Sequence, residues 1–379
     1  MTSRTEKGAD QGTHLAGPVL VIGAGLLGAS IGLGLRMRGL DVVLSDSSPS
    51  AEAVARDIGA GRLLHEIRAD DEQLAPELVV VATPPDVTAR VVVDALLMYP
   101  HAVVIDICSV KEAILQELAG IPGVVEHLSR YVGTHPMAGR EKSGPVAARG
   151  ELFTGAPWVL CAHADSAVDA VRRAESLAVD LGAVPSRMTV GEHDEAVALI
   201  SHLPQVVSSL VASRLQDSPV QALSLAGNGL RDVTRIAASD PRLWVQILSA
   251  NAGRLVDILY GVREDLNRLI GTLEDPTAGG ARLDLAELMS EGNAGQARVP
   301  GKHGTPPDSF ARLTVLVDDV PGQIAKLLTE IGHTGINVED FRLEHSPGRQ
   351  LGLAELSVLP GRRQELTESL TQRGWKVVQ

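Results

Sequence analysis

The sequence predicts three consecutive folding units: a doubly wound α/β domain, an all-α domain and a small α+β domain. Three observations support this prediction. Short apolar runs alternate with helix-like stretches over residues 17–190, apolar residues recur at helical spacing without a convincing strand over 191–291, and strands alternate with helices again over 309–379. A chain of 379 residues is long enough to form three separate cores.

The first unit is predicted to contain a parallel sheet that is covered on both faces. A strand over Val19–Ile22 ends in a glycine turn, and a helix follows that stops near Gly39. Runs that are apolar on both faces are typical of strands buried between two layers of helices. Such runs lie at residues 41–46, 77–82, 101–106, 131–134 and Pro157–Cys161, and a further helix is expected over 166–181.

The second unit is predicted to be a bundle of helices. Its apolar residues recur at helical spacing, as in Val197, Ile200, Leu203 and Val207. Asp240 followed by Pro241 is typical of a helix start. The segment carries many apolar residues for its length, so we expect part of it to be buried against a second subunit in a homodimer.

The third unit follows a segment rich in glycine and proline, residues 292–308, which is predicted to be a linker. The order strand–helix–strand–strand–helix–strand predicts a ferredoxin-like sandwich. Leu313, Val315 and Val317 alternate along its first strand. Strands are expected over 310–317, 336–343, 351–359 and 375–378, with helices opened by Pro321 and over 362–372.

Composition excludes several classes of protein. The 34 basic and 47 acidic side chains give a net charge of −13, which disfavours nucleic-acid binding. Two cysteines, Cys108 and Cys161, cannot form a disulfide framework and favour a reducing, cytoplasmic location. No run approaches about 18 apolar residues, so no membrane-spanning helix is expected. Residues 1–16 are polar and are predicted to be a disordered tail rather than a signal peptide.

The clearest binding motif is Gly23-x-Gly25-x-x-Gly28, which follows a strand and opens a helix. The first glycine permits a tight turn, the second lets backbone N–H groups approach a pyrophosphate, and the third allows close helix packing. Leu26 and Leu27 begin the helix, whose N-terminus attracts negative charge. A glycine turn without a ligand is the alternative, which this context disfavours.

Asp46 closes the second strand about 20 residues further on, where ribose recognition is expected. Its carboxylate would accept hydrogen bonds from the ribose hydroxyls and repel a 2′-phosphate, so NAD is favoured over NADP. Thr83 and Pro84 follow the third strand of this series, at the edge where open α/β sheets bind ligands. They could form a wall of the nicotinamide pocket or a plain turn.

His135 directly follows the strand over 131–134 and is well placed to act as an acid or base near neutral pH. Ser109, after a neighbouring strand, could orient its imidazole. A lone histidine is otherwise more often structural. Glu141 and Lys142 follow closely, and solvated surface charges are the alternative for both.

The helical segment adds polar residues near a helix bend. Pro204 removes a hydrogen bond, so His202 could point into a cleft or be a satisfied core histidine. Arg231 and Arg235 share a helix face and could bind carboxylates or form surface ion pairs. No lysine occurs between residues 142 and 302, which disfavours dehydrogenases of the β-hydroxyacid type.

Taken together, these motifs resemble the prephenate/arogenate dehydrogenase family of tyrosine biosynthesis, with a first domain of the Rossmann type. The third unit resembles an ACT domain, a module that commonly binds amino acids in feedback control. The matching segments are residues 23–28, 106–111, 133–144, 201–204 and 231–241, and for the ACT domain 317–322 and 335–338.

The resemblance implies oxidative decarboxylation with NAD and without a metal ion. It implies that His135 polarises or deprotonates the substrate hydroxyl and that Ser109 orients it near the nicotinamide. Further roles are implied for residues around the substrate: Arg235 binds a carboxylate, and His202, Glu141 and Trp244 line the pocket. L-Tyrosine is the implied effector at the ACT domain, with Asp319, Gly322 and Asn337 as candidate contacts.

Gln205 departs from the family pattern, in which many relatives read Ser-His-Leu-Pro-His. A neutral amide there leaves prephenate only slightly favoured over arogenate as the substrate. Two other functions remain open: a non-catalytic sensor of NAD and an amino acid, and a dehydrogenase for another small carboxylic acid. A sensor would not need His135, Ser109 and Arg235, and the missing lysine weakens the other dehydrogenase.

Overall fold

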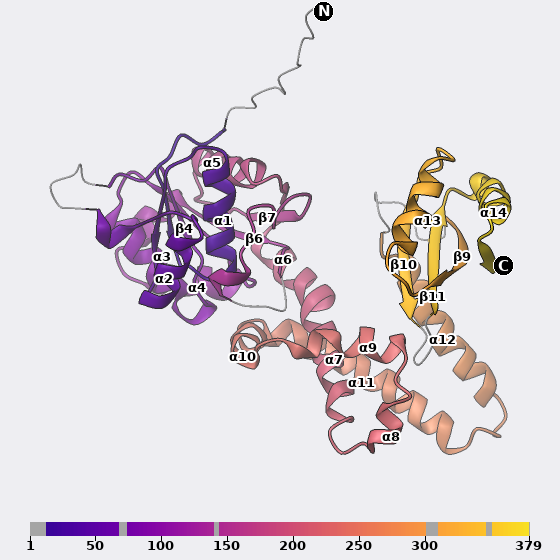
Figure 1. Cartoon of the computed structure of the whole chain (residues 1–379). Helices are drawn as coiled ribbons and strands as arrows, with labels where there is room; N and C mark the ends of the chain where they lie inside the picture. Colours follow the sequence, from indigo (N-terminus) through magenta and orange to yellow (C-terminus); the bar gives the residue numbers. More distant parts are fainter. Residues whose placement is uncertain (1–12, 68–73, 140–143, 301–309, 346–350, 379) are drawn as a thin grey trace, which may run out of the picture. The chain divides into compact units, whose positions relative to one another are not determined.

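The computed structural model describes residues 13–67, 74–139, 144–300, 310–345 and 351–378 (Figure 1). It divides into two compact units, residues 1–261 and 262–379. The first unit contains a large sheet and the helices α1 to α10, together with the start of α11. The second contains the rest of α11, then α12 and a small sheet with two helices.

The first unit is built on an eight-stranded sheet in the order β3-β2-β1-β4-β5-β6-β7-β8. All neighbouring strands are parallel except β6 and β7, which are antiparallel. The predicted doubly wound sheet is confirmed, and the short strands β3 and β8 are additions to the prediction. The strands are β1 Val19–Ile22, β2 Val42–Ser45, β3 Arg62–Leu63, β4 Leu78–Val81, β5 Val103–Asp106, β6 Tyr131–Pro136, β7 Pro157–Cys161 and β8 Val184–Arg187.

Helices cover both faces of this sheet because successive strand residues point to opposite sides. Val19 and Val21 pack in one core with α1 and α5, whereas Leu20 packs in the other core with α3 and α4. Helix α2 contributes to the first of these cores. The helices are α1 Leu26–Met37, α2 Pro49–Asp57, α3 Pro85–Met98, α4 Glu112–Gly120 and α5 Val168–Asp180.

The segment after the sheet is helical, and no strand occurs among its described residues up to 291, as predicted. Asp240 is the N-cap of α10 and accepts a hydrogen bond from the Arg242 N–H at 2.9 Å. Pro204 lies in the first turn of α7, directly after a wide π-helical turn, η4. The elements are α6 Val190–Val197, η4 Ala198–His202, α7 Leu203–Ser213, α8 Val220–Leu223, α9 Asn228–Arg235, η5 Ile236–Ala238, α10 Pro241–Ala250 and α11 Ala252–Glu274.

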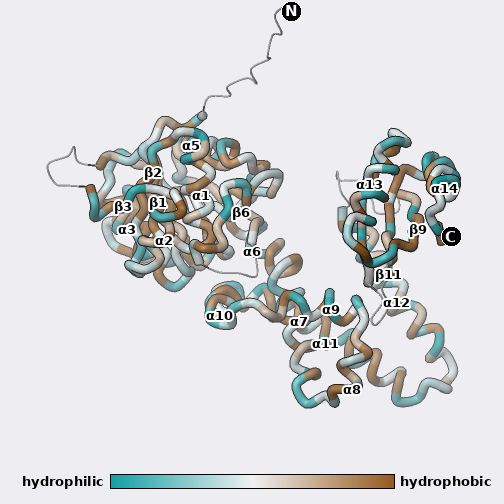
Figure 2. The backbone as a smooth tube through the Cα atoms, viewed as in Figure 1, coloured by the Kyte–Doolittle hydropathy of each residue, from teal (hydrophilic) through white to brown (hydrophobic). Residues whose placement is uncertain are grey.

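The continuous helix Val190–Ser213 is long and apolar enough to cross a membrane, with a mean hydropathy of 1.5 in its most apolar window. This test averages hydropathy over a window, whereas the sequence prediction concerned an uninterrupted apolar run, and the helix contains no such run of about 18 residues. Ser201, His202 and Gln205 interrupt the apolar run, but they add no charge, so the mean stays high. Hydrophobic positions recur along the helices of this segment (Figure 2). Large exposed ones in the first unit include Leu199, Ile200, Leu210, Val220, Leu225 and Val245.

The residues just before β1 do not form the predicted disordered tail. Leu15 is buried, and the backbone N–H groups of His14 and Leu15 donate to the Asp180 carboxylate at 3.0 Å. The N–H groups at residues 16 and 17 donate to Glu77. Two acceptors on the sheet domain therefore order residues 13–16, whereas residues 1–12 lie outside the described part of the chain.

The second unit begins with the pairing of α11 and α12 (Ala281–Ala297). Arg268 on α11 forms ion pairs with Asp284 at 2.6 Å and Glu291 at 3.3 Å on α12. These pairs support the helix past Gly292, so the predicted linker is wrong for residues 292–297. Glycine lowers helix stability by about 1 kcal/mol relative to alanine but does not forbid a helix. Residues 301–308 of the linker lie outside the described residues.

The small sheet of the second unit has the predicted strand–helix–strand–strand–helix–strand order, with sheet order β10-β11-β9-β12 and antiparallel pairings. Leu313, Val315 and Val317 face the core, as the alternation predicts. The second strand starts at Asp340 rather than at 336, because residues 333–335 form the turn after the helix and residues 336–339 pass to the strand without regular structure. The elements are β9 Ala311–Asp318, α13 Gln323–Gly332, β10 Asp340–His345, β11 Leu351–Val358, α14 Arg363–Gln372 and β12 Lys376–Val378.

Candidate active site

The glycine turn between β1 and α1 has the geometry that the motif predicts. Gly23 has a φ of +107°, and a Cβ there would lie 2.4 Å from the Ala82 carbonyl oxygen. A Cβ on Gly28 would lie 1.8 Å from the Gly23 carbonyl oxygen, so only glycine fits. Gly25, in contrast, has no neighbouring atom within 4 Å of its Cβ position. The turn is therefore tightly packed around Gly23 and Gly28, whereas the side at Gly25 is open to a ligand.

The open side of this turn meets the N-terminus of α1. No side chain caps this helix, and the first backbone hydrogen bond onto its cap runs from the Ala29 N–H to the Gly25 carbonyl oxygen. The N–H groups of Leu26 and Leu27 in the first turn are consequently available to an anion. These features fit the pyrophosphate of a dinucleotide such as NAD.

Asp46, at the end of β2, lies beside the same turn. Its Oδ2 accepts a hydrogen bond from the Ala24 N–H at 2.6 Å, and its Oδ1 accepts one from the Ser48 N–H at 2.7 Å. A carboxylate has about four lone-pair sites, so both oxygens can still accept a hydroxyl. Thr83 follows β4 and bonds Thr88 at 2.9 Å, while Pro84 is the N-cap residue of α3.

His135 belongs to a chain of three side chains. Its Nδ1 lies 2.8 Å from His193 Nε2, and His193 Nδ1 lies 2.7 Å from Asp194 Oδ1. The carboxylate is an acceptor, so the tautomer of a neutral His193 that fits this chain carries its proton on Nδ1 and accepts at Nε2. His135 must then donate from Nδ1. Its Nε2 is left unprotonated, which is the state of a general base.

Asp194 is held rigidly because its carboxylate caps α4. Both the Lys111 and Glu112 N–H groups donate to it at 2.9 Å. Burial raises the pKa of Asp194, but the hydrogen bonds from His193 and from these two N–H groups outweigh burial, and the net shift is downward. The carboxylate is therefore ionised at neutral pH and keeps accepting from His193.

A buried ion pair lies directly behind the strand that carries His135. Lys111 Nζ bonds the carboxylate of Asp106, and it also donates to the Thr134 carbonyl oxygen at 2.7 Å. The Tyr131 hydroxyl donates to Asp106 Oδ2 at 2.7 Å. Lys111 and Asp106 are almost fully buried, so the pair is shielded from water. This places a fixed positive charge next to the histidine.

The surroundings lower the pKa of His135 well below its usual 6.5. Burial is the largest cause, and unfavourable electrostatic interactions with His193, Lys111 and His202 add to it. Each of these effects disfavours the imidazolium form. His135 is therefore neutral at physiological pH, as a base must be before it takes a proton.

Ser109 does not orient His135, contrary to the expectation from the sequence. It is half-buried after β5, and no hydrogen bond joins it to His135 within the described residues. His193, held by Asp194, bonds and orients the imidazole of His135 instead. The sequence showed these two as neighbours, but their contact with His135 spans 58 residues and depends on α6 packing beside β7, the strand that pairs with β6.

Three of the residues predicted to line the substrate pocket lie on η4, α7 and α10, namely His202, Gln205 and Trp244. His202 is buried, and its ring meets the Trp244 ring edge-on at 6.1 Å. Gln205 is also buried, and its Oε1 accepts a hydrogen bond from the Ser239 hydroxyl at 3.4 Å. Arg235 is exposed at the end of α9, a helix that packs against α7. Glu141 lies outside the described residues.

The candidate effector residues lie in the second unit. Asp319 is exposed after β9, and Gly322 adopts a φ of +88° at the start of α13. Asn337 is exposed and donates to Glu339 at 2.8 Å. Their proposed role stays a prediction.

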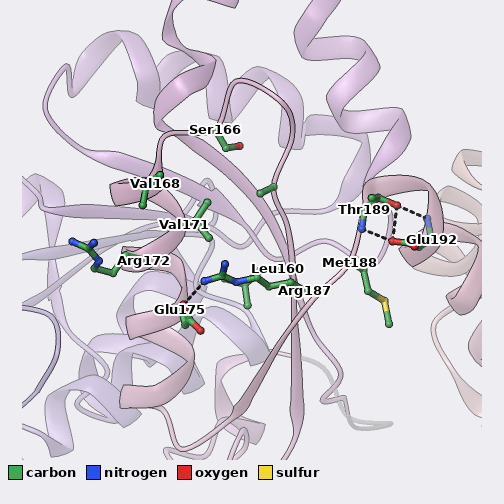
Figure 3. A pocket seen from close by; sticks show the side chains of 11 residues that line it. Leu160, Ser166, Val168, Val171, Arg172, Glu175, Arg187, Met188, Thr189 and Glu192 are labelled. Carbon is green, nitrogen blue, oxygen red and sulfur yellow. Dashed lines mark hydrogen bonds and ion pairs between the residues drawn. The ribbon is translucent and has the colours of Figure 1, made fainter.

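A pocket of about 570 Å³ opens elsewhere in the first unit, between α5, β7, β8 and the start of α6 (Figure 3). It lies at the carboxyl ends of β7 and β8, which run antiparallel to β6 with its His135. Its charged and polar groups include Arg187, paired with Glu175 at 2.7 Å, and Thr189, bonded to Glu192 in a capping box. These groups already satisfy one another, so we assign no ligand to this pocket.

A doubly wound sheet with a glycine turn, a neutral histidine at the same edge and a helical segment beside it define a nucleotide-dependent dehydrogenase. Comparison with known proteins agrees. The family model of the prephenate dehydrogenase nucleotide-binding domain matches residues 31–186, and that of the prephenate dehydrogenase dimerization domain matches 189–291. The chain belongs to the prephenate dehydrogenase family and is an NAD-dependent oxidoreductase.

Individual relatives are similar over most of the chain. The probable prephenate dehydrogenase NovF of Streptomyces niveus is 33% identical over 94% of this chain and 98% of its own length. The cyclohexadienyl dehydrogenase of Zymomonas mobilis is 30% identical over 66% and 86%, respectively. The crystal structure of Aquifex aeolicus prephenate dehydrogenase with hydroxyphenyl propionate and NAD+ is 26% identical, with a TM-score of 0.64, and covers 74% of this chain and 99% of that one.

Proposed function

We propose that the protein oxidises and decarboxylates prephenate to 4-hydroxyphenylpyruvate, with NAD as the hydride acceptor. The observation that carries this proposal is the neutral His135, whose Nε2 is free to accept a proton, at the sheet edge that also carries the glycine turn. Relatives named prephenate dehydrogenase support the choice of substrate. Arg235 would bind a substrate carboxylate, with Ser109, His202, Gln205, Glu141 and Trp244 around the ring.

In this proposal the chain's own residues align the substrate and move one proton. Bound NAD would accept a hydride from the carbon that carries the ring hydroxyl. His135 Nε2 takes the hydroxyl proton as the C=O bond forms, while His193 and Asp194 hold the imidazole in place. The ring carboxylate then leaves as carbon dioxide, the electron pair of the broken C–C bond makes the ring aromatic, and the ring oxygen takes the proton back from His135. Aromatisation supplies much of the driving force, so alignment and a single base suffice.

Arogenate is the second candidate substrate, and Gln205 favours it. Arogenate carries an ammonium group where prephenate has a keto oxygen, and the buried Gln205 carries no charge that would repel it. The solved structure of Synechocystis arogenate dehydrogenase is 25% identical and has a TM-score of 0.57. We keep prephenate slightly ahead because of the named relatives.

Regulation and assembly complete the proposal. The second unit's small sheet is proposed to be an ACT domain that binds L-tyrosine near Asp319, Gly322 and Asn337. The exposed apolar residues of α7 and α10, together with the dimerization-domain match, support a homodimer. Cys108 and Cys161 are both free and buried, which supports the proposed cytoplasmic location.

The decisive experiment measures NADH formation with prephenate and arogenate side by side, with and without tyrosine. We expect kcat/KM to be higher with prephenate than with arogenate, and we expect tyrosine to inhibit the reaction with prephenate. A higher kcat/KM for arogenate would reverse the assignment of substrate. Rates unchanged by tyrosine would remove tyrosine as the effector, and no NADH with either substrate would refute the proposed function.

Replacing Asp46 by asparagine should weaken NAD binding about tenfold, because hydrogen bonds to a charged acceptor are the stronger ones. NADP binding should weaken less, since the variant no longer repels a 2′-phosphate, so the preference for NAD narrows. Isothermal titration with both cofactors measures this. The same change at Asp57, exposed at the end of α2, is the control. Tighter binding of NADP than of NAD by the unmodified protein would contradict the role of Asp46.

A further inference from the structure

Asn251 lies between α10 and α11 and joins two parts of the site that no motif connects. It is 2% exposed, and its Nδ2 donates to the Asp194 backbone carbonyl oxygen at 2.7 Å. The same Nδ2 lies 3.3 Å from His202 Nδ1. Asp194 is therefore connected to both catalytic-site histidines. Its carboxylate bonds His193, which bonds His135, and its backbone carbonyl oxygen accepts from Asn251, which lies beside His202.

The orientation of the Asn251 amide follows from the chemistry of its neighbour. A backbone carbonyl oxygen can only accept, so the amide group that faces Asp194 O must be the NH₂ group. If the amide were flipped, two oxygens would face each other at 2.7 Å. The second N–H of that NH₂ group then meets His202 Nδ1, which must be the unprotonated nitrogen. The proton of the neutral His202 ring consequently resides on Nε2.

His202 Nε2 is a donor without an acceptor. His202 is 1% exposed, and no described residue bonds this atom. Buried polar atoms without a partner are rare in native proteins, so each one needs an explanation such as a bound ligand or water. Burial also lowers the pKa of His202 to about 4, so the ring remains neutral and keeps a single N–H over the physiological range. Trp244, predicted to line the substrate pocket, lies against the same ring.

We propose that Asn251 is a positioning residue that locks His202 in its Nε2–H tautomer, so that His202 donates a hydrogen bond to an oxygen of the substrate. This inference rests on the proposed function and assigns different roles to the two histidines. Contacts to Asp194 hold the two rings in opposite protonation states at Nε2. His135 presents an unprotonated Nε2 that accepts a proton, and His202 presents a protonated Nε2 that binds an oxygen acceptor.

The first test reads the tautomer directly, without any substrate. Long-range ¹H–¹⁵N correlation spectra of the full-length protein with labelled histidine distinguish Nδ1–H from Nε2–H rings, and His202→Asn assigns the signal. We expect His202 to be a neutral Nε2–H ring at pH 7. A neutral Nδ1–H ring or a charged ring would overturn the proposal, whatever substrate the enzyme uses.

The second test replaces Asn251 by aspartate, which has nearly the same shape but only acceptors. His202 should then protonate Nδ1, and its pKa should rise beside the new carboxylate. We expect KM to rise about tenfold and to become pH-dependent, with kcat changed less than about threefold and NAD affinity unchanged. The control is Asn293→Asp, the same change at an exposed position of α12.

Folding and function are separated by further measurements. If Asn251→Asp does not bind NAD, the less disruptive Asn251→Ser and His202→Gln are compared with the unmodified protein for the same rise in KM. A KM unchanged in every variant that binds NAD would overturn the role of Asn251. If the protein oxidises neither prephenate nor arogenate, the proposed function fails, while the spectrum still decides the tautomer.

Discussion

Replacing His135 by asparagine is expected to lower kcat about 1,000-fold, in the middle of the range attributed to general acid–base catalysis. Asparagine can still donate from its amide to His193 Nε2, so the local packing is kept, but it cannot take a proton at neutral pH. NAD affinity should remain within a factor of two, because β4 and β5 separate the glycine turn after β1 from the strand β6 that carries His135. Steady-state kinetics with NADH detection and titration of NAD measure the two effects.

The control for this variant is His101→Asn, the same change at an exposed position before β5. Its kcat and its NAD affinity should both match those of the unmodified protein. An equal loss of turnover and of NAD binding in His135→Asn would argue against a catalytic role, because it would indicate a damaged fold rather than a missing base.

The pH profile gives an independent check on His135. The active form is the unprotonated ring, and burial and nearby positive charge lower the pKa of His135 well below 6.5. As pH falls, kcat/KM should therefore remain constant through pH 6.5 and decline only at clearly lower pH. A decline centred at or above pH 6.5 would show that a different group, or a solvated His135, controls the reaction.

Replacing Lys111 by methionine is expected to lower the free energy of unfolding of the first unit by about 3–5 kcal/mol. The substitution removes one partner of a buried ion pair and leaves the Asp106 carboxylate without its countercharge. The Thr134 carbonyl oxygen also loses the Lys111 donor. Thermal and urea unfolding, followed by Trp158 fluorescence in the core of the first unit, measure the loss.

A double variant separates charge from packing in this prediction. Adding Asp106→Asn to Lys111→Met removes the uncompensated charge, so part of the lost stability should return. Lys376→Met, at an exposed position of β12, is the control and should change stability by less than about 0.5 kcal/mol. A double variant less stable than Lys111→Met would contradict the buried-charge explanation. In Lys111→Met itself, the acid limb of kcat/KM should move to higher pH, because a repulsive charge near His135 is gone.

Local patterns in the sequence predicted the scaffold well. Strand and helix periods located β1, β2, β4, β5, β6 and β7 and the helical character of residues 191–291, because burial imposes these periods on neighbouring residues. The glycine turn was predictable because its three glycines lie within one short strand–turn–helix stretch, although the close neighbour of Gly23, the Ala82 carbonyl oxygen, comes from the end of β4. Helix ends were predicted less accurately where an ion pair with another helix supports the end. An example is α12, whose Glu291 pairs with Arg268.

The sequence by itself determined the layered sheet, the nucleotide turn and the presence of His135 at a strand end, since each depends on spacing within a short stretch of chain. The tertiary structure alone decided which atoms of the site are protonated. His193 meets His135 across 58 residues, and Asn251 meets Asp194 across 57. The physical reason is that a tautomer is set by the partner in space, and only the packing of α6, η4 and α10 against one another and the sheet selects that partner.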